Sequence, residues 1–115
     1  MKQWGRIETG TVATISTAHI GREELDLLND VYKYRTKEID DNDHWIADLN
    51  WASYHYGYMV SAPGVIRRAK ENPEETPAFL LEAAELARDL ELAWIVYDED
   101  GDTLESMTNY YDEQD

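Results

Sequence analysis

Alternating side chains near the start of the chain predict a β-strand. Residues 11–20 are rich in Val, Ile, Thr and Ser, which alternate between two faces. A second β-rich run covers residues 4–8, and Thr9 and Gly10 separate the two runs. We therefore expect a strand over residues 11–20 that can form half of a hairpin.

A helical pattern follows this strand. Apolar side chains recur at steps of three and four residues at Leu25, Leu28, Val31 and Tyr32. Glu23 and Glu24 suit the positive end of a helix. The spacing predicts a helix over residues 22–34.

The middle of the chain is polar first and aromatic afterwards. Residues 36–50 begin as a polar loop, and their last part predicts a short helical turn around Trp45. Residues 51–62 read as one strand that ends at Pro63-Gly64, a pair that breaks strands. One face of this strand would hold Tyr54, Tyr56, Tyr58 and Val60.

Two helices are expected next. Residues 65–71 have short helical character. Thr76 and Pro77 then predict a helix start, with the Thr hydroxyl as cap and Pro at the first helical position. The apolar face of this helix would consist of Phe79, Ala83, Leu86 and Leu90, and its solvated face of Glu82, Glu85 and Asp89.

The last elements predict a hairpin and, with the others, a fold class. Residues 94–98 form a short apolar strand, Asp100-Gly101 is a strong turn signal, and residues 103–108 would be the return strand. The order of elements predicts an α+β fold: a small antiparallel or mixed sheet with two to three helices packed on one face. With 115 residues, the chain is expected to form a single domain, 1–115, with an acidic tail over about 109–115.

Charge is distributed unevenly along the chain. Residues 1–37 carry six Lys and Arg against five Asp and Glu, whereas residues 38–115 carry four against twenty, and the formal net charge is -15. Such a charge repels nucleic acids and anionic membranes and attracts basic protein surfaces. We expect neither direct nucleic-acid binding nor membrane binding. Adaptation of a whole proteome to high salt is an alternative source of this acidity.

Residue types argue against several kinds of site. The chain has no cysteine, its six glycines are scattered singly, and its histidines, His19, His44 and His55, lack the spacing of a zinc site. Asp98, Asp100 and Asp102 alternate as calcium ligands do, but Gly101 does not stand where a calcium loop needs its glycine, which favours a hairpin turn. We expect no cofactor, no metal and no enzymatic activity. Without an apolar run of membrane length or a signal pattern, the protein is expected to be soluble and cytoplasmic.

Ser16 and His19 do not predict a nucleophile and its base. Residues three apart on one strand point to opposite faces, so the hydroxyl would not reach the ring. A structural hydrogen-bonding role at the end of the strand is expected for His19.

The aromatic residues form a second candidate surface. Trp45, Trp51, Tyr54, Tyr56 and Tyr58 are either core residues or an exposed patch, and the core is favoured. Two further tyrosines, Tyr110 and Tyr111, stand among acids and are expected to be exposed. Aromatic rings beside carboxylates suit arginine-rich surfaces.

Three blocks of the sequence resemble a known family. These blocks are Ile15-Ser16-Thr17-Ala18-His19-Ile20, Tyr56-Gly57-Tyr58-Met59-Val60, and Trp94-Ile95-Val96-Tyr97-Asp98-Glu99-Asp100-Gly101. Their order resembles a small uncharacterised domain family of bacteria, plasmids and phages with a Ser-Thr-Ala-His-Ile start, a Tyr-Gly aromatic strand and an Asp-x-Asp-Gly hairpin. The resemblance implies a fold and a mobile-element setting and transfers no functional residue.

The expected function follows from the acidity. We expect a non-enzymatic inhibitor from a mobile element that blocks the nucleic-acid site of a host defence complex, in CRISPR or restriction systems, by charge mimicry. Its partner would be a basic nucleic-acid-binding protein or complex of the host. The expected partner-binding residues are Glu82, Glu85, Asp89, Asp98, Glu99, Asp100, Asp102, Glu105, Tyr110, Tyr111, Asp112 and Glu113. The alternative is a protein-interaction or regulatory module that uses the Tyr/Trp strand face, with the acids serving solubility; the oligomeric state stays open.

Overall fold

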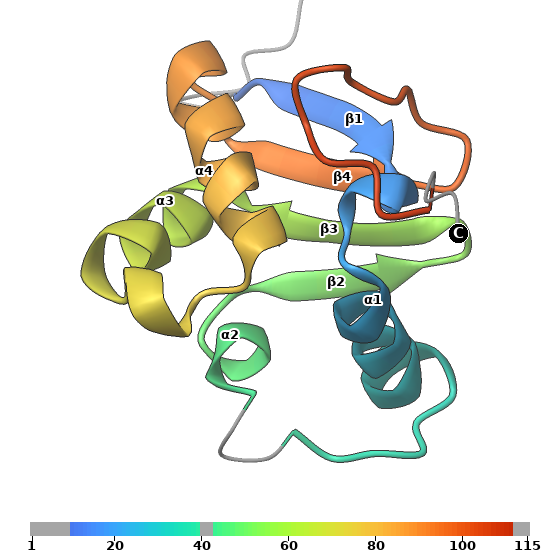
Figure 1. Ribbon diagram of the computed structural model, residues 1–115. Coiled ribbons are helices and arrows are strands. Elements are labelled where there is room, and N and C mark those ends of the chain that lie inside the picture. The colour runs from blue at the N-terminus through green and yellow to red at the C-terminus, as the bar shows by residue number, and fades with distance from the viewer. Residues whose placement is uncertain (1–9, 40–42, 112–115) are drawn as a thin grey trace, which may run out of the picture.

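A four-stranded mixed sheet forms the centre of the protein (Figure 1). The computed structural model describes residues 10–39 and 43–111. The strands are β1 (Val12–Ser16), β2 (Trp51–Tyr54), β3 (Gly57–Ser61) and β4 (Trp94–Asp98), in the spatial order β1-β4-β3-β2. β1 runs parallel to β4, and the other two pairs are antiparallel. The fold is therefore α+β, as predicted.

Helices cover one face of this sheet (Figure 1). The three longer ones are α1 (Arg22–Leu28), α3 (Ala62–Glu71) and α4 (Ala78–Leu90). The shorter ones are α2 (His44–Ala47) and the 3-10 turns η1 (Thr17–His19) and η3 (Pro73–Glu75). A π-helical turn, η2 (Asn29–Lys33), continues α1, so the helix that the sequence predicts over residues 22–34 is confirmed to Lys33.

An aromatic cluster fills the space between the sheet and the helices. Trp45 of α2 packs edge-on against Trp51 of β2 and Phe79 of α4, with ring centroids 5.8 Å apart in both pairs. Phe79 in turn meets Tyr97 of β4 at 6.1 Å. These rings are buried, so they provide much of the apolar area that stabilises the fold.

The aromatic stretch from residue 51 to 62 is two strands rather than the predicted one. β2 and β3 pair antiparallel with Tyr54 opposite Gly57, and the chain reverses at His55 and Tyr56. Tyr54 and Tyr56 are exposed while Tyr58 is buried, so the four residues assigned to one face do not share it. The prediction was wrong because this turn carries none of the Asn-Gly or Asp-Gly signals typical of hairpins.

The predicted hairpin through Asp100-Gly101 is also wrong. A turn does form, with the Gly101 N–H donating to the Asp98 carbonyl at 2.9 Å, but both sides of β4 are already paired with β1 and β3. The chain crosses to β1 instead, where the Ser16 N–H donates to the Asp102 carbonyl at 2.9 Å. Residues 103–108 therefore form no strand.

Two helix starts differ from the predictions by a few residues. β3 ends at Ser61, just before Pro63-Gly64, and α3 begins at Ala62, so Pro63 lies in the first turn of the helix. α4 begins at Ala78 with Pro77 at the cap position, and the Thr76 hydroxyl donates to the Asn72 carbonyl at 2.7 Å. Thr76 is thus not the helix cap. At the other end of α4, Leu90 is 55% exposed and leaves the predicted apolar face.

Candidate protein-binding surface

A buried histidine holds the C-terminal segment, residues 99–111, against the body of the protein. The His19 Nε2 atom accepts a hydrogen bond from the Leu104 N–H at 2.8 Å, which leaves the proton on Nδ1. Nδ1 lies 2.9 Å from the Thr108 carbonyl and donates to it. The structural role predicted for His19 is confirmed, and the Ser16 hydroxyl bonds elsewhere, accepting from the Ala18 N–H at 3.0 Å.

Side chains from α1 and α4 hold the same segment from two sides. The Glu82 carboxylate of α4 accepts from the Thr108 hydroxyl at 2.8 Å and from its N–H at 3.1 Å. The Arg22 Nε of α1 donates to the Tyr110 carbonyl at 2.8 Å, and its guanidinium lies over the Tyr111 ring at 5.1 Å. The segment therefore joins the two helices across the covered face of the sheet (Figure 1).

Carboxylates from both helices meet around Tyr110. Burial, and then the charges of Glu82 and Glu24, raise the pKa of the Tyr110 phenol. At the neighbouring Tyr111, burial and the charge of Asp26 raise the pKa, while Arg22 lowers it. Acids of the near-neutral first third of the chain thus lie beside acids of its last third.

Along α4 the acidic side chains form a row. Glu82, Glu85 and Asp89 stand at steps of three and four residues, so they share one side of the helix. Glu82 is half-buried, whereas Glu85 and Asp89 are exposed. We call the acids of this row and those beside the two tyrosines the acidic ridge, which comprises Glu24, Asp26, Glu82, Glu85 and Asp89.

A second acidic group, the acidic turn, follows β4 over residues 98–102. The Asp98 carboxylate accepts from the Tyr54 hydroxyl at 2.6 Å and from the Asp100 N–H at 2.7 Å. These two bonds, the tyrosine's first, lower the pKa of Asp98, so it stays ionised and fixed in direction. Glu99, Asp100 and Asp102 are exposed around it, and so is Glu105 further along the segment.

Of the two tyrosines that the sequence predicts to be exposed, the structure places only one at the surface. Tyr111 is 44% exposed, as expected. The other tyrosine, Tyr110, is only partly exposed and packs against the core, because the segment that carries it is fixed at His19 and Arg22. Asp112 and Glu113 lie outside the described residues.

The aromatic candidates divide between core and surface. Trp45, Trp51 and Tyr58 are buried, which confirms the core interpretation for these three. Tyr54 and Tyr56 are 38% and 52% exposed at the β2–β3 turn. Since the Tyr54 hydroxyl binds Asp98, the exposed rings adjoin the acidic turn.

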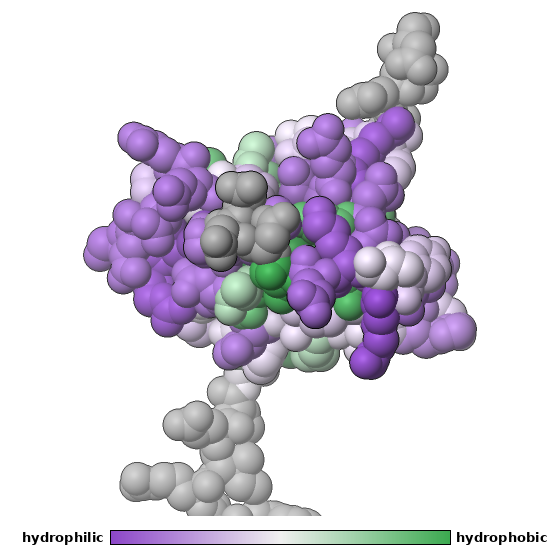
Figure 2. Space-filling model, turned by 90° about the horizontal axis from the view of Figure 1, so that it is seen from below, coloured by the Kyte–Doolittle hydropathy of each residue, from purple (hydrophilic) through white to green (hydrophobic). Residues whose placement is uncertain are grey.

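Hydrophilic side chains dominate the surface seen from below, while a smaller apolar area lies near its middle (Figure 2). None of the helices in the described part of the chain has the length and apolar character that a membrane crossing needs. Across the same described residues, no three His, Asp and Glu side chains are placed to share a metal ion.

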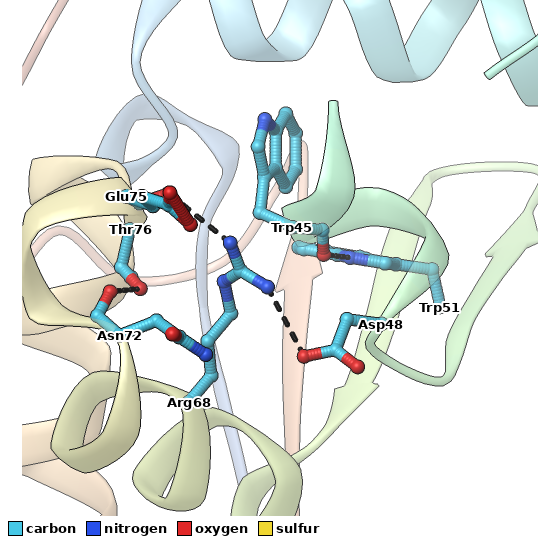
Figure 3. Close-up of polar contacts among 7 residues, drawn as sticks. All are labelled: Trp45, Asp48, Trp51, Arg68, Asn72, Glu75 and Thr76. Carbon is cyan, nitrogen blue, oxygen red and sulfur yellow. Dashed lines mark hydrogen bonds and ion pairs between the residues drawn. The ribbon is translucent and has the colours of Figure 1, made fainter. Parts of the chain in front are cut away.

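One structural residue, the buried Arg68, was not predicted from the sequence. Arg68 of α3 is 3% exposed; its Nη1 contacts the Asp48 carboxylate at 3.0 Å and its Nη2 donates to the Glu75 carbonyl at 3.1 Å (Figure 3). It ties α2, α3 and η3 together, so its role is structural. The sequence offered no signal, because an arginine in the last turn of a helix is ordinarily a surface residue.

Comparisons with known proteins give a family and no function. Neither the curated proteins nor the solved structures include a match to the chain. A family model described as the C-terminal domain of a family of unknown function, DUF5983, matches residues 12–112. This match covers both acidic groups, the His19 anchor and the whole sheet, and on it we conclude that the chain belongs to the DUF5983 C-terminal domain family.

Proposed function

We propose that the protein is a non-enzymatic inhibitor, carried by a mobile element, that binds the nucleic-acid site of a host defence complex. Its carboxylates would occupy the Lys and Arg side chains that otherwise contact phosphates. The target would be a CRISPR effector or a restriction enzyme, because these complexes hold nucleic acid in basic channels. The acidic ridge and the acidic turn would make the contact.

The spacing of the row on α4 carries this proposal. From Glu82 to Asp89 the chain advances by seven helical residues, about 10 Å of helix axis. One strand of duplex DNA carries a phosphate about every 3.4 Å, or about three over that length. Glu82, Glu85 and Asp89 are spaced about 4.5 and about 6 Å apart along the helix axis, so they form a regular row of charges somewhat sparser than the phosphates of one strand.

Two of the carboxylates are held in place by hydrogen bonds, which favours phosphate mimicry over an acidic surface that serves only solubility. Glu82 is held by Thr108, and Asp98 by Tyr54 and the Asp100 N–H, so these carboxylates are oriented before any partner binds. An oriented charge loses less side-chain entropy on binding than a free one. The fixed acids would thus supply affinity, and the exposed acids around them long-range attraction.

The exposed rings of Tyr54 and Tyr56 support a second candidate, a protein-interaction module. It would bind through the β2–β3 hairpin that carries these two rings, which we call the aromatic hairpin. Tyrosine is common in binding interfaces because it adds large area at low entropic cost. Contact through these rings would depend weakly on salt, whereas contact through carboxylates depends on it strongly.

Competition with DNA tests the proposal. The tagged protein is used to capture complexes from nuclease-treated lysate of the host strain, and duplex DNA is then added to the washed complex. We expect a CRISPR effector or restriction enzyme to be captured and to be released by its own target DNA. A partner that DNA cannot displace would contradict phosphate mimicry and favour the aromatic hairpin.

A further inference from the structure

A cavity lies between the α1–η2 helix and the β2–β3 hairpin, beside the acidic turn. Its volume is 190 Å³. Its walls include Leu25, Asn29 and Lys33 from the helix, Ser53 and Tyr58 from the hairpin, and Glu99 from the turn after β4. Because these residues come from three separate parts of the chain, no local sequence pattern predicts the cavity.

One side of the helix supplies the first wall. Leu25, Asn29 and Lys33 follow one another at steps of four residues, which places them on one helix face. Asn29 and Lys33 belong to the π-helical turn, a distortion that proteins often keep at functional sites. This wall is apolar at Leu25 and cationic at Lys33.

A short hydrogen bond orients the polar groups of the cavity. The Tyr58 hydroxyl donates to the Asn29 Oδ1 at 2.6 Å. Burial, followed by the neighbouring Tyr34, Tyr32 and Asp30, raises the pKa of Tyr58 to about 12, so the phenol keeps its proton at neutral pH. With Oδ1 occupied, Asn29 has its amide N–H groups left to donate to a guest.

The walls carry charges of opposite sign. Lys33 stands on the helix and Glu99 on the opposite wall, with Tyr58 and Leu25 lining the same space. A guest with only a positive charge would meet Lys33, and one with only a negative charge would meet Glu99. A guest that carries both charges can pair with each of them.

The size of the cavity limits the guest further. A protein cavity of about 150 Å³ holds one benzene ring, whereas sites for larger ligands start at about 300 Å³. A volume of 190 Å³ therefore suits a single small metabolite better than a nucleotide. We propose that this cavity binds a free α-amino acid, with the carboxylate at Lys33 and Asn29 and the ammonium group at Glu99.

A titration followed by ¹H–¹⁵N NMR tests this proposal. Glycine, L-alanine, L-valine, L-leucine and L-threonine are each added to about 10 mM, beside their N-acetyl and C-amide derivatives. We expect at least one free amino acid to give saturable shifts in the amides of residues 25–33 and 53–58. Both derivatives should bind about tenfold more weakly, because each loses one charge-assisted hydrogen bond.

Matched variants test whether Lys33 and Glu99 bind the two charged groups of the amino acid. Lys33→Met and Glu99→Gln should each weaken binding about tenfold, while Lys37→Met and Glu105→Gln, which change exposed charges outside the cavity, should leave it unchanged. All four positions are exposed, so the fold should persist, and the spectra verify it. The absence of saturable shifts, equal binding of the derivatives, or equal effects of cavity and control variants would overturn the proposal. Because the titration uses no partner protein, its result is independent of the proposed inhibition.

Discussion

The Leu104 N–H donates to Nε2 of His19, 85 positions earlier in the chain, at 2.8 Å. On its other side the same ring binds the Thr108 carbonyl. Two turns of the C-terminal segment thus depend on one buried imidazole, and the segment in turn carries Tyr110 and Tyr111 between the acids of α1 and α4. The position of Thr108, which holds the Glu82 carboxylate of the acidic ridge, therefore rests on His19.

We expect His19→Ala to destabilise the protein by about 3 kcal/mol, because it leaves two backbone groups unpaired and opens a cavity. Urea denaturation followed by tryptophan fluorescence measures this change. A loss below about 0.5 kcal/mol would mean that the segment is held without the imidazole.

Glycine is required at position 101 because the backbone there lies close against β1. A Cβ at this position would lie 2.4 Å from the Ile15 carbonyl oxygen, so Gly101→Ala should destabilise the fold by about 1–3 kcal/mol. Gly101 does not adopt a positive φ, so this close approach, and not its backbone conformation, is what requires glycine here.

Gly64 provides the matched control. A Cβ there makes only an ordinary contact, 3.4 Å from Leu49, and the residue lies inside α3, where alanine is favoured. Gly64→Ala should therefore be neutral or stabilising in the same thermal melts. Equal melting temperatures for the two variants would contradict the close packing of the turn against β1.

Arg68 should not be replaceable by lysine. Its guanidinium reaches the Asp48 carboxylate and the Glu75 carbonyl at once, which a single ammonium group cannot do in the same geometry. We expect Arg68→Lys to lower the free energy of unfolding by about 2 kcal/mol. Asp48 is half exposed, so Asp48→Asn should cost less, and the reverse order in chemical denaturation would contradict this arrangement.

Alkaline pH should weaken the fold through Tyr58. Its pKa is raised to about 12 in the folded protein, above the ordinary value of 10.0, so the folded state favours the protonated phenol. The stability that this preference contributes is complete below pH 10 and is lost as the pH rises towards 12. Tyr58→Phe should make stability less dependent on pH in this window; an unchanged pH dependence in denaturation experiments would contradict the shift.

Patterns internal to one element predicted much of the fold. The period of α4, the helix that starts at Arg22 and the strand at Val12–Ser16 follow from local alternation and spacing. The hairpin predicted after β4 was wrong because β4 pairs with β1, a contact between distant residues that leaves no local signal. The β2–β3 hairpin was missed because its turn carries no sequence typical of hairpins.

In the candidate surface, too, features within one helix were predictable and contacts between distant residues were not. The row on α4 follows from helical spacing, but the meeting of Glu24 with Glu82 around Tyr110 depends on tertiary packing. A variant that removes acidic charges needs a control elsewhere on the surface, and Glu23 and Glu24 in the near-neutral residues 1–37 are the first choice by sequence. Since Glu24 belongs to the acidic ridge, acids at the end of α3 serve better.

Removal of charge should separate function from stability. The variant Glu85→Gln, Asp89→Asn, Asp100→Asn, Asp102→Asn changes exposed carboxylates, so folding should be nearly intact while inhibition of the host complex is lost. The control removes as many exposed carboxylates through Glu38→Gln, Glu71→Gln, Glu74→Gln and Glu75→Gln. Transformation of the host by a plasmid that its defence system targets measures inhibition, and equal potency of the two variants would count against the acidic ridge and turn.

The salt dependence of binding tests phosphate mimicry most directly. The dissociation constant for the captured host complex is measured by calorimetry between about 50 and about 200 mM salt. We expect affinity to fall at least about tenfold over this range, and to fall less for the variant at residues 85, 89, 100 and 102 than for its control. An affinity that stays constant with salt would contradict phosphate mimicry and leave the aromatic hairpin of Tyr54 and Tyr56 as the binding surface.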